Sequence, residues 1–234
     1  MKIDVLTLFP KMFESPFNES IIKRAIQNKI FQLNIHNLRD WAIDGYGTVD
    51  DKPFGGGVGM LIRPDVVYKA LNEITNNQSI DYKSNRRIIL MSPRGKRFDQ
   101  QKAEELAKVD NIVILSGHYE GFDQRISDYM VDEEISIGDY VLTGGELPAM
   151  VIIDSVVRLL AGVLGKDESS QSESFGEILI DGKKIRTIEY PQYTRPREFM
   201  NYKVPEVLLS GDPRKIKSWQ IEQIKKILKE RNGK

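Results

Sequence analysis

The sequence predicts an α/β fold built on a mostly parallel sheet, followed by a smaller second domain. Three segments place a glycine-bearing loop at the expected end of a strand: IILM before SPRG, NIVIL before SGHYEG, and the segment SIGDYVLTGGELPAM from Ser136 to Met150. A stretch of helix-forming composition, from Phe98 to Asp110, separates the first two. Strands that alternate with helices are typical of parallel sheets, in which ligands bind at the loops after the strands.

The remaining elements of the larger domain follow from apolar spacing and from proline. The apolar run from Ile3 to Phe9 predicts a further buried strand. A helix is expected from Glu19, because Ile22, Ala25 and Ile26 share one face. Prolines in a first turn predict two more helices, one from Pro64 and an apolar one from Pro148 to Leu160, with a polar loop over residues 76–84.

The composition changes after Gly162. The polar, serine-rich run GKDESSQSESFGE predicts a linker or lid over residues 164–177, after a first domain of residues 1–163. Residues 178–234 are expected to form a small, helical and basic domain. Its main helix starts with Asp212 as N-cap and Pro213 in the first turn, and carries Trp219 and Ile224 on one face and lysines on the other.

Charge is unevenly distributed, although the net charge of the chain is zero. Residues 183–234 contain 14 Lys and Arg against 6 Asp and Glu, a net charge of +8, so the preceding residues carry −8. Such asymmetry favours contact between the C-terminal part and a polyanion, and a solvated helix face is the alternative.

Composition limits the other classes of protein and site. The chain has no cysteine, which excludes disulfides and thiolate metal sites, and its two histidines are too few for a histidine metal cage, so that any metal must be oxygen-ligated. No apolar stretch approaches the roughly 20 residues of a membrane span, and Pro10 ends the first apolar run early. We therefore expect a cytoplasmic protein that does not contact membranes.

The glycine-rich segments differ in what they can bind. The run from Gly55 to Gly59 lacks the Lys-Ser/Thr of a phosphate-binding P-loop and the third glycine of a dinucleotide fingerprint, so a tight turn is an equal alternative. The loops SGHYEG and SIGDYVLTGGELPAM combine glycine with aromatic, apolar and carboxylate groups. That combination suits a planar heterocycle such as adenine, and turns that need positive φ are the alternative.

Two further features carry charge or aromatic rings. Arg158 interrupts an apolar helix, where it either meets an anionic ligand or extends its charge to solvent. In EYPQYTRPREF, from Glu189 to Phe199, tyrosines and arginines alternate between prolines. These side chains suit stacking on bases and contacts to phosphate, and a surface tether between domains is the alternative.

Taken together, these motifs resemble the bacterial tRNA (guanine-37-N1)-methyltransferases, of the SPOUT class of S-adenosylmethionine enzymes. The resemblance runs from TLFPKMF at Thr7, through DDKPFGGGVGML, SPRG, SGHYEG, SIGDYVLTGGELPAM and GVLGK, to YPQYTRP and VPEVLLSG at Val204. It implies a SPOUT-type parallel sheet with a C-terminal trefoil knot, and a homodimer with composite active sites. It also implies methyl transfer from S-adenosylmethionine to N1 of guanosine-37 in tRNA, and the family is associated with magnesium.

The resemblance also implies the site residues. The family's essential arginine falls on Arg158, and Glu173 stands where the family has its catalytic aspartate, so we expect Glu173 to be the general base. His118 replaces an arginine that is usual in the family. The cofactor-binding positions correspond to Leu90, Pro93, Gly117, Tyr119, Glu120, Gly121, Ile137, Tyr140, Leu142, Gly144, Gly145 and Pro148.

Overall fold

The chain divides into two compact units, Met1–Gly165 and Lys166–Lys234. The computed structural model describes residues 1–75, 85–164, 173–180 and 182–232. The polar loop predicted over residues 76–84 and most of the predicted lid lie outside the described residues. Each unit is described by itself.

The first unit contains a five-stranded parallel sheet in the order β2-β1-β6-β5-β7. Its strands are β1 (Lys2–Thr7), β2 (Gln32–Asn37), β5 (Arg86–Arg97), β6 (Asn111–Leu115) and β7 (Glu133–Ser136). Because all the strands run in the same direction, their carboxyl ends lie at one edge of the sheet. This confirms the predicted parallel α/β class and brings together the loops that follow the strands.

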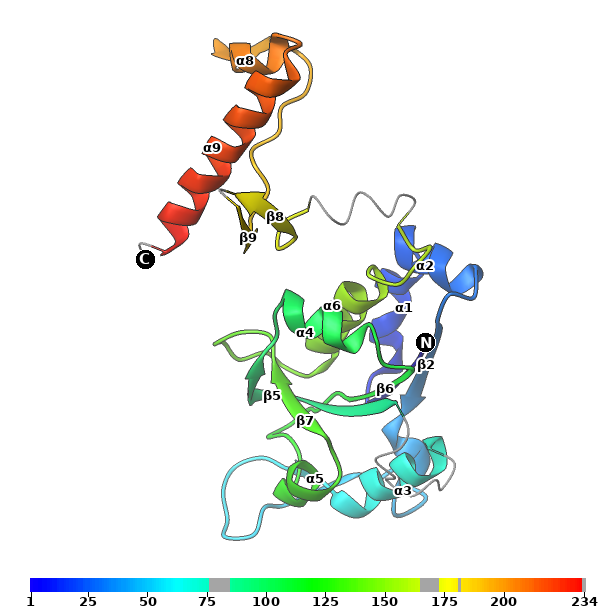
Figure 1. The fold of residues 1–234 in the computed structure, drawn as a ribbon. Coiled ribbons are helices and arrows are strands. Elements are labelled where there is room, and N and C mark those ends of the chain that lie inside the picture. Colours follow the sequence, from blue (N-terminus) through cyan, green and yellow to red (C-terminus); the bar gives the residue numbers. More distant parts are fainter. Residues whose placement is uncertain (76–84, 165–172, 181, 233–234) are drawn as a thin grey trace. The chain divides into compact units, whose positions relative to one another are not determined.

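Helices cover both faces of the sheet (Figure 1). On one face, α1 (Glu14–Phe17), α2 (Ser20–Gln27), α4 (Gln100–Leu106) and α6 (Glu146–Val157) enclose one hydrophobic core; on the other, α3 (Pro64–Ile74) and α5 (Gln124–Tyr129) enclose a second. Alternate residues of β1 divide between them: Ile3 and Val5 belong to the first core and Leu6 to the second. Burial on both sides explains why these strands have nearly continuous apolar sequences.

Short elements connect the main ones. Two 3-10 helices, η1 (Pro10–Phe13) and η2 (Leu38–Trp41), follow β1 and β2. A two-stranded antiparallel sheet of β3 (Asp50–Asp51) and β4 (Leu61–Ile62) holds the glycine-rich run at its turn. The turn is exposed, with Phe54 and Val58 more than nine-tenths accessible, and this favours the turn interpretation of the run over a phosphate loop.

The structure corrects the prediction for SPRG. This segment was expected to be a loop after a strand, but β5 continues through it to Arg97. Ile135 of β7 pairs with both Met91 and Lys96, so the intervening residues bulge out of the ladder. Gly95 permits the return, because a Cβ at this position would lie 2.5 Å from the backbone carbon of Glu134.

The apolar helix also differs in its bounds. It starts at Glu146, two residues before the predicted Pro148, and its last residue is Val157 rather than Leu160. Pro148 still lies in the first turn, where its missing N–H costs no helical hydrogen bond. Arg158 is therefore the C-cap residue rather than a residue of the helix interior. A cation at this end is favoured by the helix dipole.

A buried carboxylate lies within the sheet. Asp4 of β1 is 2% exposed, and its oxygens lie 2.8 Å from Asn34 Nδ2, 2.8 Å from His36 Nε2 and 2.9 Å from Lys2 Nζ. Burial alone would raise the pKa of Asp4, but the hydrogen bonds from His36, Asn34 and Lys2 outweigh it and lower the pKa. These contacts tie the edge strand β2 to β1.

The second unit contains strands as well as helices, so the prediction of a helical domain was incomplete. Two antiparallel hairpins are present: β8 (Glu177–Ile180) with β9 (Lys183–Arg186), and β10 (Glu198–Phe199) with β11 (Tyr202–Lys203). They precede α8 (Glu206–Leu209) and the long α9 (Pro213–Asn232). As predicted, Asp212 caps α9, and its Oδ1 accepts hydrogen bonds from the backbone N–H groups of Arg214 and Lys215.

No helix among the described residues combines the length and the apolar character that crossing a membrane requires.

Candidate functional site

A cavity of about 280 Å³ lies at the carboxyl edge of the sheet. Its walls come from the bulge in β5 after Met91, from the loop after β6 that starts at Ser116, and from the loop of residues 137–145 between β7 and α6. The carboxyl edge of a parallel sheet is where α/β proteins bind their ligands. The three segments singled out from the sequence therefore meet at one site.

The two glycine loops approach each other closely. The backbone N–H of Gly145 donates a 2.7 Å hydrogen bond to the carbonyl of Gly117. A Cβ at Gly145 would lie 2.7 Å from the backbone nitrogen of Gly117 and 2.8 Å from the Cα of Ser116. In the sheet, β5 lies between β6 and β7. The chain that leaves β7 therefore passes the end of β5 and reaches the loop after β6.

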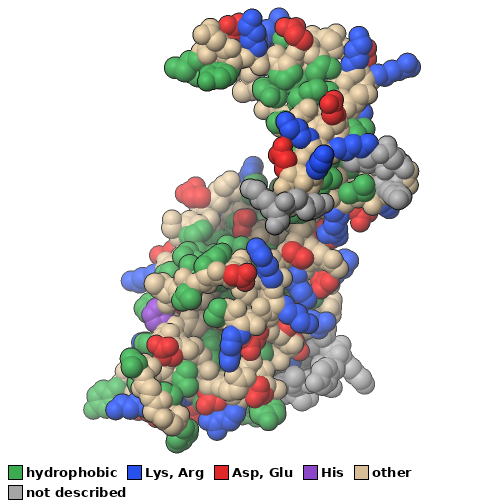
Figure 2. All heavy atoms as spheres, turned by 90° about the vertical axis from the view of Figure 1, so that its left-hand side faces the viewer, with side chains coloured by type: hydrophobic (Ala, Val, Ile, Leu, Met, Phe, Trp, Pro, Cys, Tyr) green, Lys and Arg blue, Asp and Glu red, His purple; other side chains and the backbone are tan. Residues whose placement is uncertain are grey.

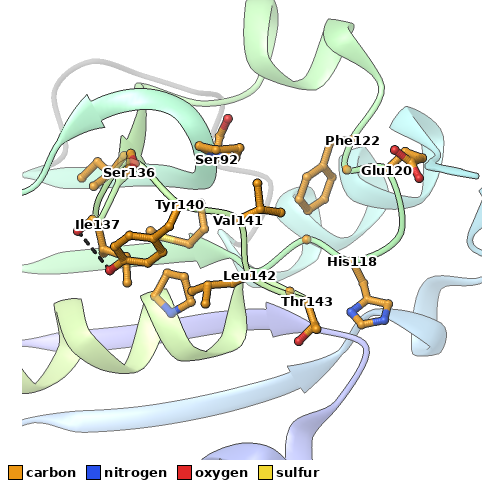
Figure 3. Close-up of a pocket in the computed structure, with 18 of the residues that line it drawn as sticks. Ser92, His118, Glu120, Phe122, Ser136, Ile137, Tyr140, Val141, Leu142 and Thr143 are labelled. Atoms are coloured by element: carbon orange, nitrogen blue, oxygen red, sulfur yellow. Dashed lines mark hydrogen bonds between the residues drawn. The ribbon is translucent and has the colours of Figure 1, made fainter.

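Apolar side chains and a few polar groups face the cavity (Figure 3). Tyr140 and Ile137 lie on one side, and Phe122, Glu120 and His118 lie on the other. The hydroxyl of Tyr140 donates to the carbonyl of Ile137 at 3.4 Å, which holds the ring against its own loop. An apolar lining with few polar groups is typical of sites for small organic ligands.

The backbone after β7 is held by a serine. The Ser136 hydroxyl donates to the Gly138 carbonyl at 3.1 Å and accepts from the Gly138 N–H at 3.2 Å. On the opposite loop, Tyr119 has a φ of 58°, which is uncommon for an aromatic residue. The Ser136 hydrogen bonds thus constrain the backbone at one side of the cavity, and Tyr119 has a non-regular backbone conformation at the other.

Eleven of the twelve residues expected to bind a cofactor line this cavity: Pro93, Gly117, Tyr119, Glu120, Gly121, Ile137, Tyr140, Leu142, Gly144, Gly145 and Pro148. Leu90 does not line it. The Leu90 side chain is 2% exposed and belongs to the core on the α3 side of the sheet. Any contact from Leu90 to a ligand would have to come from its backbone.

Comparison with known proteins gives the family. The model of the family described as tRNA (Guanine-1)-methyltransferase TrmD matches residues 1–233. The chain belongs to this family. Curated relatives named tRNA (guanine-N(1)-)-methyltransferase include those of Staphylococcus carnosus strain TM300, 50% identical, and Staphylococcus aureus strain JH9, 51% identical. Each alignment spans 223 residues, which is 95% of this chain and 85% of the relative. The chain is thus a methyltransferase of the kind that modifies guanine in tRNA.

Several residues of this TrmD-family cavity were missed by the sequence prediction. Ser92, His118, Phe122, Ser136 and Val141 line it in addition to the expected residues. All five lie inside or next to the predicted motifs. The alternation of glycines with side chains that can pack on a ring was the available signal.

A buried hydrogen bond joins two of the sequence motifs beneath the cavity, the one that starts at Thr7 and the one from Ser136 to Met150. Glu146, the first residue of α6, is 1% exposed, and its Oε1 accepts a 2.8 Å hydrogen bond from the Thr7 hydroxyl. The same hydroxyl oxygen accepts from the Phe9 N–H at 2.9 Å. This pair joins the end of β1 to the start of α6, directly after the loop of residues 137–145.

The two expected catalytic residues lie in different units. Arg158 ends α6 in the first unit and does not line the cavity. It lies ten positions after Pro148, which corresponds to roughly 15 Å along the helix at 1.5 Å per residue. Glu173 is the first described residue of the second unit. The structure of one chain therefore does not bring Arg158 to this cavity.

Within the described ranges, no three His, Asp or Glu side chains converge in a way that could hold a metal ion. The expected magnesium therefore has no assigned ligands there, and no step of the reaction is attributed to it.

Proposed function

We propose that this protein transfers a methyl group from S-adenosylmethionine to N1 of guanosine-37, immediately 3′ of the anticodon in tRNA. Family membership supports the tRNA guanine substrate. The observation that carries the cofactor assignment is the convergence of eleven expected residues on one cavity. Because its substrate is tRNA, we expect the enzyme to act in the cytoplasm.

The cavity has features that suit this cofactor. Its apolar lining from Ile137, Leu142 and Pro148 can pack on a flat heterocycle, while exposed backbone groups of the glycine loops can bond the edges of that ring. The volume of about 280 Å³ is close to the lower end for small-molecule sites. When bound, S-adenosylmethionine supplies an electrophilic methyl group on a positively charged sulfur.

The residues of the chain must then activate guanine. N1 carries a proton at neutral pH, so a base has to take it as the N1–methyl bond forms and the sulfur–methyl bond breaks. We assign this role to Glu173, whose carboxylate would accept the proton. Loss of the N1 proton moves electron density toward O6, and the guanidinium of Arg158 would stabilise that charge. S-adenosylhomocysteine is the other product.

The base assignment is tested by single-turnover methyl transfer with Glu173→Gln. The glutamine keeps the size of the side chain but cannot accept the proton, so we expect the rate to fall by about 100-fold or more. Glu177→Gln, in β8 four residues away, is the matched control. A normal rate for Glu173→Gln, with normal affinity for S-adenosylhomocysteine, would remove Glu173 from this role.

We propose that a second copy of the chain completes each site. Arg158 lies about 15 Å along α6 from the cavity-lining Pro148, so an arginine that acts at this cavity would have to come from another copy of the chain. An apolar surface suitable for a partner is next to the cavity: Val141 is 88% exposed, Leu147 51% and Val151 43%. Leu147 and Val151 are one helical turn apart on the exposed side of α6.

Mixed dimers test this arrangement. Gly145→Val, which fills the cavity wall, and Arg158→Ala are each expected to be inactive alone. A purified mixed dimer combines one Gly145→Val copy with one Arg158→Ala copy. The Arg158→Ala copy has the normal cavity, and the Gly145→Val copy has the intact Arg158. If Arg158 serves the cavity of its partner, activity returns to up to half of the wild-type value. If Arg158 serves its own cavity, the mixed dimer stays inactive, and the composite site is wrong.

Two further features are part of the proposal. We propose that the loop of residues 137–145 forms part of a trefoil knot, because it returns from β7 past β5 to the loop after β6.

We also propose that residues 1–163 form the catalytic domain, residues 164–177 a lid and residues 178–234 a tRNA-binding domain. Residues 183–234 of that last domain carry a net charge of +8. Removal of residues 178–234 should then flatten the salt dependence of tRNA binding.

A further inference from the structure

A second cavity, which is shallow and widely open to solvent, lies entirely within the second unit. It has a volume of about 400 Å³ and is lined by Val207 of α8 and by five residues of the first turns of α9: Arg214, Lys215, Ser218, Trp219 and Glu222. It combines an indole, two cations, a hydroxyl and a carboxylate. No role for it follows from the cofactor site, which lies in the first unit.

The indole of Trp219 is held by two tyrosines. The ring centroid of Tyr190 lies 6.5 Å away with the planes at 72°, and that of Tyr193 lies 6.3 Å away with the planes at 57°. Neither tyrosine lines the cavity, so these contacts fix the indole while part of its surface remains available there. An aromatic ring that is already fixed loses little entropy when a ligand stacks on it.

Positive charge lies beside this ring. Arg214 and Lys215 are both exposed and line the cavity, and Lys215 Nζ lies 3.8 Å from Asp212 Oδ2. Lysine and arginine side chains are interspersed with hydrophobic ones over the second unit (Figure 2). Glu222, also in the wall, can accept hydrogen bonds from a base amino group or a ribose 2′-hydroxyl.

We propose that this cavity binds one unpaired nucleotide of RNA, with its base stacked on Trp219 and its phosphates neutralised by Arg214 and Lys215. An aromatic surface flanked by cations is the usual means of binding single-stranded nucleic acid. The proposal rests on the proposed function, because it takes the tRNA substrate as the source of the nucleotide. It adds a second RNA contact, which the methyl-transfer reaction itself does not require.

Tryptophan fluorescence reports directly on this cavity, because the chain has only two tryptophans. In a full-length Trp41→Phe background, Trp219 is the only tryptophan, and excitation at the long-wavelength edge of indole absorption avoids the nine tyrosines. Titration with an unmodified tRNA transcript should quench its emission. Trp219→Ala should raise the Kd for tRNA by about 5- to 150-fold, the range measured for loss of one stacked base.

The cations are tested through salt. The double variant Arg214→Gln with Lys215→Gln should lower the slope of log Kd against log salt by about 1.4, or about 0.7 for each single-strand phosphate. Lys217→Gln is the matched control, since Lys217 is exposed on the same helix but does not line the cavity. All variants should bind S-adenosylhomocysteine normally, which verifies that the first unit is folded. They should also keep the helical circular dichroism of the wild type, which verifies that α9 of the second unit is folded.

Unchanged Trp219 emission on tRNA binding, together with equal salt slopes for the double variant and Lys217→Gln, would overturn the proposal. These measurements are of binding, so they separate the two claims. A protein that methylates tRNA but shows no response at Trp219 contradicts only this inference. A protein that quenches Trp219 on tRNA binding but forms no methylated guanosine contradicts only the proposed function.

Discussion

Replacing Gly145 with alanine tests whether the close approach of the two glycine loops forms the cofactor site. Gly145 has φ of −84° and ψ of −3°, a conformation that alanine adopts without strain. The new methyl carbon would nevertheless lie 2.7 Å from the backbone nitrogen of Gly117 and 2.8 Å from the Cα of Ser116. Both atoms belong to backbone, so the loops themselves must separate.

The magnitude follows from the cost of overpacking, about 1–3 kcal/mol for a methyl group forced into a filled site. If the loops open to absorb it, the 2.7 Å hydrogen bond from Gly145 to Gly117 lengthens and the cavity changes shape. Expressed wholly as lost binding, this cost corresponds to about 5- to 150-fold weaker affinity. Any part that remains as strain lowers the midpoint of thermal unfolding, by about 2–4 °C per kcal/mol for a chain of this size.

Calorimetric titration with S-adenosylhomocysteine and thermal unfolding measure the two parts. Gly45→Ala is the matched control, because a Cβ there meets no atom within 4 Å and Gly45 has a negative φ. We expect Gly45→Ala to bind like the wild type. If Gly145→Ala also binds and unfolds like the wild type, the close contact between the loops does not shape the site.

Three further variants test the stability of the scaffold. Asp4→Asn should destabilise the protein at pH 7. Because folding lowers the pKa of Asp4, the ionised carboxylate stabilises the fold above the ordinary pKa of about 4, and this stabilisation is lost as the pH falls through the lowered pKa. Unfolding measurements at pH 7 and pH 3 should therefore show a smaller difference between variant and wild type at pH 3. Thr7→Val should cost about 1–3 kcal/mol in urea unfolding, because buried Glu146 loses its donor, and an unchanged midpoint would refute this. Asp212→Ala should cost about 0.5–2 kcal/mol of the stability of α9, seen as faster amide exchange in its first turn; equal exchange would rule out the cap.

The sequence was informative where structure depends on local pattern. Apolar runs identified the strands on both sides of the cavity, and the glycine loops identified its walls. The individual cofactor residues came from the family resemblance, and eleven of those twelve line the cavity. Asp212 was correctly predicted as the cap of α9, since capping depends on neighbouring residues only.

The features that it missed depend on contacts between distant residues. The continuation of β5 through SPRG requires pairing with β7, and no local property of the segment reveals that partner. The hydrogen bond between Thr7 and Glu146 joins residues 139 positions apart. The hairpin of β8 and β9 is different, because the sequence has Asp-Gly at positions 181–182, which is a common local signal for a two-residue hairpin turn.

The most direct test of the proposed function is incubation of the full-length protein with labelled S-adenosylmethionine and an unmodified tRNA transcript, followed by mapping of the modified nucleoside. We predict one labelled product, 1-methylguanosine, at the position immediately 3′ of the anticodon, and no product when that guanosine is replaced by adenosine. Absence of label, or label on another atom or at another position, would contradict the proposal.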